Sequence, residues 1–205
     1  DRNRPSVIVW ELSLNETWWQ SAWPDFSQTA MNIGHAEYPG DQCYISAWKD
    51  DNIYDIFIAT PGAGARTYSG PAPLIVSEYG HWEYGGHSST SDVHRKDGEA
   101  AMLIQAANHQ EGHHLNRGLS NMCGDGLWVA FDYVAYESGA IDKLRLPKFS
   151  NYFFASQRDP NVNIPAIDSG PMVYIANYWT ASSPTTVKVF SNCDQVKLYK
   201  NDVLQ

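Results

Sequence analysis

Two glutamates stand at the ends of apolar segments, where a β/α fold gathers its catalytic groups. Val7–Leu12 leads to Asn15 and Glu16, and Leu74–Val76 leads to Glu78. Short apolar runs of this kind are typical of strands buried on both faces. A carboxylate is costly inside a core but suits the mouth of a parallel-strand barrel. Glycoside hydrolysis needs two such carboxylates, one to protonate the leaving oxygen and one to attack the sugar. The two strand ends therefore indicate sugar-cleaving chemistry.

Other acidic side chains compete for these roles. A single glutamate is more often a surface or ion-paired residue than a catalytic one, so the interpretation rests on the two motifs together. Glu11, Glu83, Glu111 and Glu137 follow no comparable motif.

Two histidines have the spacing of metal ligands on a helix. His109 and His113 lie four positions apart. The glutamate between them is misplaced for a zinc protease, and Gly112 is expected to interrupt the helix. We therefore predict a solvated helix end and no metal site.

Composition limits the class of protein. The chain has 205 residues, 43% of them hydrophobic and 18% charged, which predicts a folded chain of one large domain or somewhat more. Eight Trp and twelve Tyr supply flat apolar rings with polar edges, which suit sugar clefts but equally cores and interfaces.

The net charge and the cysteine spacing limit the classes of partner and of metal or disulfide site that the chain can have. The net charge is −9 and no Lys/Arg cluster is present, so we expect no nucleic acid and a neutral or acidic partner. Cys43, Cys123 and Cys193 lack zinc or disulfide-framework spacing. No segment has the length and apolarity of a membrane span, so no membrane partner is expected. The compartment stays open.

The order of elements predicts two architectures. Up to about residue 157, strands alternate with helices, which is typical of parallel β/α units. After Arg158 the helical pattern stops and short apolar segments predict an antiparallel sandwich. The expected strands are 7–12, 43–48, 53–59, 74–76, 127–134, 173–178, 185–190 and 195–199, and the expected helices are 26–35, 98–115 and 148–156.

The two glutamate motifs also match a known family. Asp1-Arg-Asn-Arg-Pro-Ser-Val-Ile-Val-Trp10 with Leu14-Asn-Glu16 resembles the acid/base strand of glycoside hydrolase family 2. Pro73-Leu-Ile-Val-Ser-Glu-Tyr-Gly-His81 resembles its nucleophile strand, and Gly126-Leu-Trp-Val-Ala-Phe-Asp132 its eighth barrel strand. The family contains β-galactosidases, β-glucuronidases and β-mannosidases, and the resemblance covers nearly the whole chain.

The resemblance implies a fold and a domain division. Residues 1–157 would form strands four to eight of a (β/α)8 TIM barrel, 158–170 a linker, and 171–205 the start of an immunoglobulin-like β-sandwich. Half a barrel leaves two unpaired parallel edges, so the remainder of the enzyme is the expected partner. An oligomer remains open.

The resemblance also implies roles for six residues. Glu16 would be the acid/base and Glu78 the nucleophile of a retaining mechanism. Asn15 would bind the sugar 2-hydroxyl or orient Glu16, and Trp128 would form the floor of the sugar site. Tyr79 would hold Glu78 by a hydrogen bond. His81 would bind a sugar hydroxyl or pack within its loop, and both readings stay open.

The expected substrate is a β-galactoside, either an oligosaccharide or a small glycoside. Family members that act on glucuronides carry an Asn-x-Lys motif after the eighth strand, and residues 136–145 contain none. An unpaired substrate carboxylate would be costly to desolvate beside two glutamates. The mechanism requires no cofactor and places no metal at the reacting carbon, although an activating or structural cation is not excluded. The same mechanism acting on a β-mannoside or a β-glucuronide is the alternative within the family. The competing function classes are a noncatalytic carbohydrate-binding or structural module and a metal-dependent hydrolase.

Overall fold

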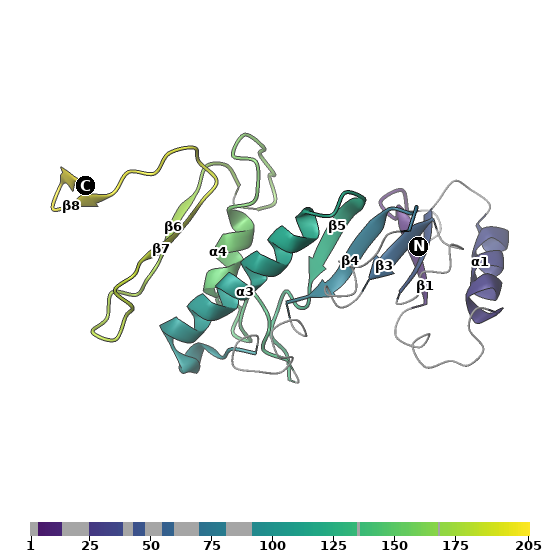
Figure 1. Ribbon diagram of the computed structural model, residues 1–205, viewed down its shortest axis with the longest axis horizontal. Coiled ribbons are helices and arrows are strands. Elements are labelled where there is room, and N and C mark those ends of the chain that lie inside the picture. The colour runs from purple at the N-terminus through teal and green to yellow at the C-terminus, as the bar shows by residue number, and fades with distance from the viewer. Residues whose placement is uncertain are drawn as a thin grey trace. The chain divides into compact units, whose positions relative to one another are not determined.

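The computed structural model describes residues 4–13, 25–38, 43–47, 55–59, 70–80, 92–134, 136–167 and 169–205. The chain forms two compact units, one of residues 1–83 and 111–128, the other of residues 84–110 and 129–205 (Figure 1). This division does not coincide with the expected boundary near residue 157, which stays a prediction.

A five-stranded sheet builds the first unit. Its strands follow one another in chain order, and every neighbouring pair is parallel, as the alternation of strands and helices predicted (Figure 1). Leu74 and Val76 share one face of β4 and are fully buried, whereas Ile75 on the other face is half-buried, so the expected burial is complete on one face only. The strands are β1 (Val9–Ser13), β2 (Cys43–Ala47), β3 (Ile56–Ala59), β4 (Leu74–Tyr79) and β5 (Met122–Leu127).

Helix α1 (Asp25–Glu37) connects β1 to β2 along the chain. Its buried residue Met31 packs against Trp10 and Leu12 of β1. The helix was expected to end near Gly34, but it continues to Glu37. Gly34 accepts a hydrogen bond from the backbone N–H of Tyr38, so it lies inside the last turn.

The predicted strand at 127–134 is wrong in position. The strand that pairs with β4 is β5, Met122–Leu127, and residues 128–134 contribute only isolated bridges, at Phe131 and Tyr133. β5 contains two glycines, Gly124 and Gly126. One of them is needed there, because a Cβ on Gly126 would lie 3.1 Å from the backbone oxygen of Ser77 in β4. Close approach of two backbones favours glycine within a strand.

Helix α3 (Glu99–Arg117) follows the short 3-10 helix η2 (Arg95–Asp97). It runs without a break through Gly112, so the predicted interruption is wrong. Gly112 is buried.

The second unit has an apolar core shared by helices and an antiparallel pair of strands. The core brings Met102 and Ala106 of α3 together with Phe149 and Phe153 of α4 (Phe149–Ala155). β6 (Val173–Ala176) and β7 (Lys188–Ser191) pair antiparallel and contribute Ala176 and Phe190 to it. β8 (Tyr199–Lys200) and β9 (Val203–Leu204) form a separate hairpin. Antiparallel pairing after residue 170 is as predicted, and the sandwich itself remains a prediction.

A buried lysine fixes the segment between β5 and α4. Lys148 is fully buried, and its Nζ lies 2.8 Å from the Asp132 carboxylate. The same Nζ donates to the backbone oxygens of Val93 at 2.7 Å and Glu137 at 2.8 Å. Burial lowers the pKa of Lys148 and raises the pKa of Asp132, and their hydrogen bond opposes both shifts. Removing either partner would leave an uncompensated buried charge.

A second ion pair anchors residues 142–147. Arg95 donates from Nε to Asp142 at 2.6 Å and from Nη2 to the backbone oxygens of Leu146 and Pro147. Burial disfavours the charge of Asp142, but the hydrogen bonds from Arg95 and from the backbone N–H groups of Leu146 and Leu144 outweigh it. The pKa of Asp142 therefore lies below its usual 3.8.

Across the described residues, no helix has both the length and the apolar character needed to span a membrane.

Candidate active site

Glu78 and Tyr79 are the last two residues of β4. Glu78 is half-buried and Tyr79 is buried, whereas the strand before them is anchored by Leu74 and Val76. Gly80 follows with a φ of 85°, a backbone conformation that side-chain-bearing residues rarely adopt. The chain therefore turns away directly after Tyr79 and leaves the Glu78 carboxylate at the carboxyl edge of the sheet.

A β-bulge lies at Glu78. Val76 of β4 pairs with Asp125 of β5, and Tyr79 pairs with Leu127, so β4 has one more residue than β5 over this stretch. A bulge of this kind bends the strand and re-aims its side chains, and such bulges occur often beside active sites. Gly126 faces the bulge and lets the Ser77 carbonyl approach β5 closely.

Trp128 lies alongside Tyr79. The backbone N–H of Trp128 donates to the backbone oxygen of Tyr79 at 3.0 Å, directly after β5 ends. The Trp128 side chain is half-buried. The structure thus brings three of the six predicted site residues, Glu78, Tyr79 and Trp128, to the ends of two paired strands.

Strand β1 has a similar irregularity at its end. Glu11 pairs with Ile45 and Ser13 with Ser46, so β1 also carries an extra residue just before the segment that leads to Glu16. Because the strands are all parallel, β1 and β4 end at the same edge of the sheet. Asn15, Glu16 and His81 lie outside the described residues, and their roles stay predictions.

Glu137, one of the other carboxylates considered for the catalytic roles, is held in ion pairs. Its side chain is buried and forms ion pairs with Lys143 and His94. Glu11 and Glu111 are exposed, and Glu83 lies outside the described residues. A catalytic role for Glu137 is therefore disfavoured by its salt bridges.

The two histidines of α3 form no solvated helix end, so that prediction is wrong. His109 is fully buried, and its ring centre lies 6.1 Å from that of Phe154. His113 pairs through Nδ1 with the Asp125 carboxylate of β5 at 2.8 Å. The sequence signal was present, because His109 follows Met102 and Ala106 at helical spacing and so shares their buried face. Within the described part of the chain, no three His, Cys, Asp or Glu side chains gather as a metal site.

Comparison with curated proteins finds two β-galactosidases and a β-glucuronidase. A β-galactosidase of Thermoanaerobacter pseudethanolicus is 28% identical over 219 residues, which covers 98% of this chain and 28% of the relative. A β-galactosidase of Thermoanaerobacterium thermosulfurigenes is 25% identical and covers 97% and 29%. A β-glucuronidase of Formosa agariphila is 26% identical and covers 94% and 16%. The chain thus spans less than a third of the length of these relatives. No family model matches it.

Solved structures share the fold at lower identity. A Bacteroides uniformis β-glucuronidase 2, covalently bound to a cyclophellitol-6-carboxylate aziridine, superposes with a TM-score of 0.68 at 16% identity. The match covers 98% of this chain and 30% of that chain. A Dictyoglomus thermophilum β-glucuronidase gives a TM-score of 0.59 at 15% identity over 75% of this chain and 32% of that one.

Sequence similarity over nearly the whole chain and a shared fold thus agree with the resemblance that the two glutamate motifs predicted. The chain is a relative of the glycoside hydrolases named β-galactosidase and β-glucuronidase.

Proposed function

We propose that the complete natural polypeptide that carries this chain is a retaining glycoside hydrolase. Glu78 attacks the anomeric carbon and forms a glycosyl-enzyme, and Glu16 first protonates the leaving oxygen and then deprotonates the attacking water. Asn15, Tyr79, His81 and Trp128 bind or orient the sugar and the two carboxylates. The chemistry needs no cofactor.

The observation that carries this proposal is the position of Glu78. Its carboxylate stands at the carboxyl edge of a parallel sheet, on a bulged strand, beside the segment that begins at Trp128. Catalytic groups of β/α enzymes gather at this edge. Strand β1, which leads toward Glu16, ends at the same edge and is bulged as well. A noncatalytic module has no need of two acidic motifs there.

We further propose that β1 to β5 are strands four to eight of a (β/α)8 barrel. An unbroken parallel sheet in chain order supports this, and so does the likeness to much longer solved structures. In the same proposal residues 1–157 belong to the barrel, 158–170 to a linker and 171–205 to an immunoglobulin-like sandwich. The remainder of the enzyme would then supply the missing strands.

For the substrate we propose a β-galactoside. Two relatives are named β-galactosidase, and residues 136–145 lack the Asn-x-Lys motif expected of glucuronide-cleaving members. A β-glucuronide is the second candidate, because a β-glucuronidase is also among the relatives.

The test compares aryl β-galactoside, β-glucuronide, β-mannoside and β-glucoside on the complete polypeptide. We expect kcat/KM to be at least about tenfold higher for the galactoside than for the glucuronide, or ~1.4 kcal/mol in the barrier. Faster turnover of the glucuronide would contradict the proposed substrate, but the proposed retaining mechanism would still stand. Absence of turnover on all four would contradict the proposed function.

A further inference from the structure

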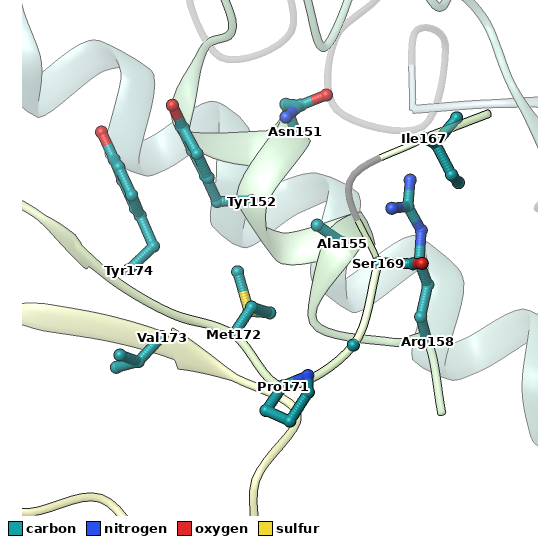
Figure 2. A pocket seen from close by; sticks show the side chains of 11 residues that line it. Asn151, Tyr152, Ala155, Arg158, Ile167, Ser169, Pro171, Met172, Val173 and Tyr174 are labelled. Atoms are coloured by element: carbon teal, nitrogen blue, oxygen red, sulfur yellow. The ribbon is translucent and has the colours of Figure 1, made fainter. Parts of the chain in front are cut away.

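A hollow of about 370 Å³ lies in the second unit, beside α4 (Figure 2). One wall comes from α4, which contributes Asn151, Tyr152 and Ala155, and Tyr152 also packs against the apolar core. The other wall is the irregular chain that enters β6, between Ile167 and Tyr174. Ligand pockets start at roughly 300 Å³, so this one suits a single small ring system.

Two tyrosines make a flat side of the hollow. The rings of Tyr152 and Tyr174 stack with centres 3.4 Å apart and planes 2° apart. Figure 2 shows their hydroxyls at the same end of the stack. Burial raises the pKa of Tyr174 to about 12, so its hydroxyl stays protonated at neutral pH. The pair offers an apolar surface with polar edges.

The opposite wall is held by one side chain. Asn192 accepts from the backbone N–H of Met172 at 2.7 Å and donates to the backbone oxygens of Gly170 at 2.9 Å and Arg158 at 3.2 Å. Gly170 has a φ of 104°, which bends the chain around the hollow. A wall fixed by such bonds is pre-formed, which reduces the entropy that binding would cost.

Three polar side chains converge on this hollow. Asn151 makes no side-chain hydrogen bond within the described residues, so its amide can both donate and accept. The Ser169 oxygen accepts from the backbone N–H of Ile164, which leaves its own hydrogen to donate. Arg158 is exposed at the rim, and Figure 2 shows it across the hollow from Tyr152.

We propose that this hollow binds a neutral pyranose unit of a carbohydrate chain, as a sugar site that shares no residue with the proposed catalytic site. The tyrosine pair supplies the apolar surface for the C–H face of the ring. The amide, hydroxyl and guanidinium supply donors and acceptors for its hydroxyls. Only the choice of galactose as the sugar rests on the proposed function.

The test uses the complete polypeptide in affinity electrophoresis through gels containing a neutral β-galactan. Asn151→Ala removes the amide, and Ala155→Phe fills the hollow. Gln157→Ala is the matched control, because Gln157 follows α4 but does not line the hollow. We expect the apparent dissociation constant for galactan to rise about fivefold in Asn151→Ala, as the loss of one hydrogen bond of ~1 kcal/mol predicts, and to rise at least as much in Ala155→Phe, with no change in the control.

Aryl β-galactoside turnover and the thermal midpoint are measured alongside. We expect Asn151→Ala to have the wild-type turnover and the wild-type thermal midpoint. Unchanged retention in both pocket variants would overturn the proposal. A fall in turnover that parallels the fall in retention in Asn151→Ala would also overturn it. Stronger retention by polygalacturonate than by galactan would overturn the neutral-sugar assignment. If the wild type cleaves no aryl glycoside, the proposed function fails while retention still decides whether the hollow binds sugar.

Discussion

Three residues shape the end of strand β4 at Glu78. Val76 anchors β4 in the core, and the extra residue in the bulge turns the following side chains. Gly126 permits the close backbone approach that the bulge requires. The assignment of Glu78 as nucleophile therefore has a physical basis in the strand as well as in the motif.

Glu16 is expected to show the signature of an acid/base residue. In Glu16→Ala, an aryl glycoside with a good leaving group should still form the glycosyl-enzyme, because such a group needs little protonation. The second step should then be slow and accelerate with added azide, giving a glycosyl azide. Steady-state rates with and without azide measure this. An azide-independent variant in which both steps fail would remove Glu16 from this role.

At the scale of elements, the pairing of β4 with β5 makes the site sensitive to one methyl group. In Gly126→Ala the new Cβ would lie 3.1 Å from the Ser77 oxygen, so the bulge beside Glu78 must shift. We expect kcat/KM to fall by about tenfold or more, because small misplacements of catalytic groups are costly. The thermal stability should fall by only ~1 kcal/mol.

Gly124→Ala is the control for this substitution. A Cβ at Gly124 meets nothing within 4 Å, although the residue lies in the same strand. It should retain near-wild-type activity. Equal activity of the two variants would contradict the role of the bulge in positioning Glu78.

The positions of the apolar strands were the part of the fold that the sequence predicted best. β1 to β4 lie where short runs such as Leu74–Val76 predicted them, because β-branched and apolar side chains pack well on a pleated, partly buried sheet. The position of β5 was predicted wrongly, because the need for Gly126 comes from its contact with β4, which is distant in sequence. The length of a strand end is likewise set by its partner, so Glu78 lies within β4 and not after it.

Side-chain partners were the least predictable part of the site. The pairing of His113 with Asp125 depends on how α3 lies against β5, which no local pattern reveals. The Lys148–Asp132 pair is similar, because a buried lysine is rare without a partner and its partner lies far along the chain. The burial of His109 was available from helical spacing alone.

At the scale of the whole molecule, the Arg95–Asp142 pair should contribute to stability in a pH-dependent way. The pKa of Asp142 is lowered in the folded state, so its contribution is complete above the unfolded value of 3.8 and is lost as pH falls through the lower folded value. Asp142→Asn should therefore cost about 1–2 kcal/mol near neutral pH and much less at strongly acidic pH.

The stability cost is measured from the thermal midpoints of the wild type and Asp142→Asn between neutral and strongly acidic pH. The two curves should converge as pH falls. A constant difference between them at every pH would show that the carboxylate charge contributes nothing to folding.

The central claim is that Glu78 is the nucleophile of a glycoside hydrolase, and one substitution tests it most directly. Glu78→Gln keeps the size of the side chain but removes the attacking carboxylate. Glu111→Gln, at an exposed position of α3, is the control. Turnover of an aryl β-galactoside by the complete polypeptide is measured together with the thermal midpoint. The account predicts loss of turnover in Glu78→Gln with an unchanged midpoint, and full activity in the control. Near-normal turnover in Glu78→Gln would contradict it.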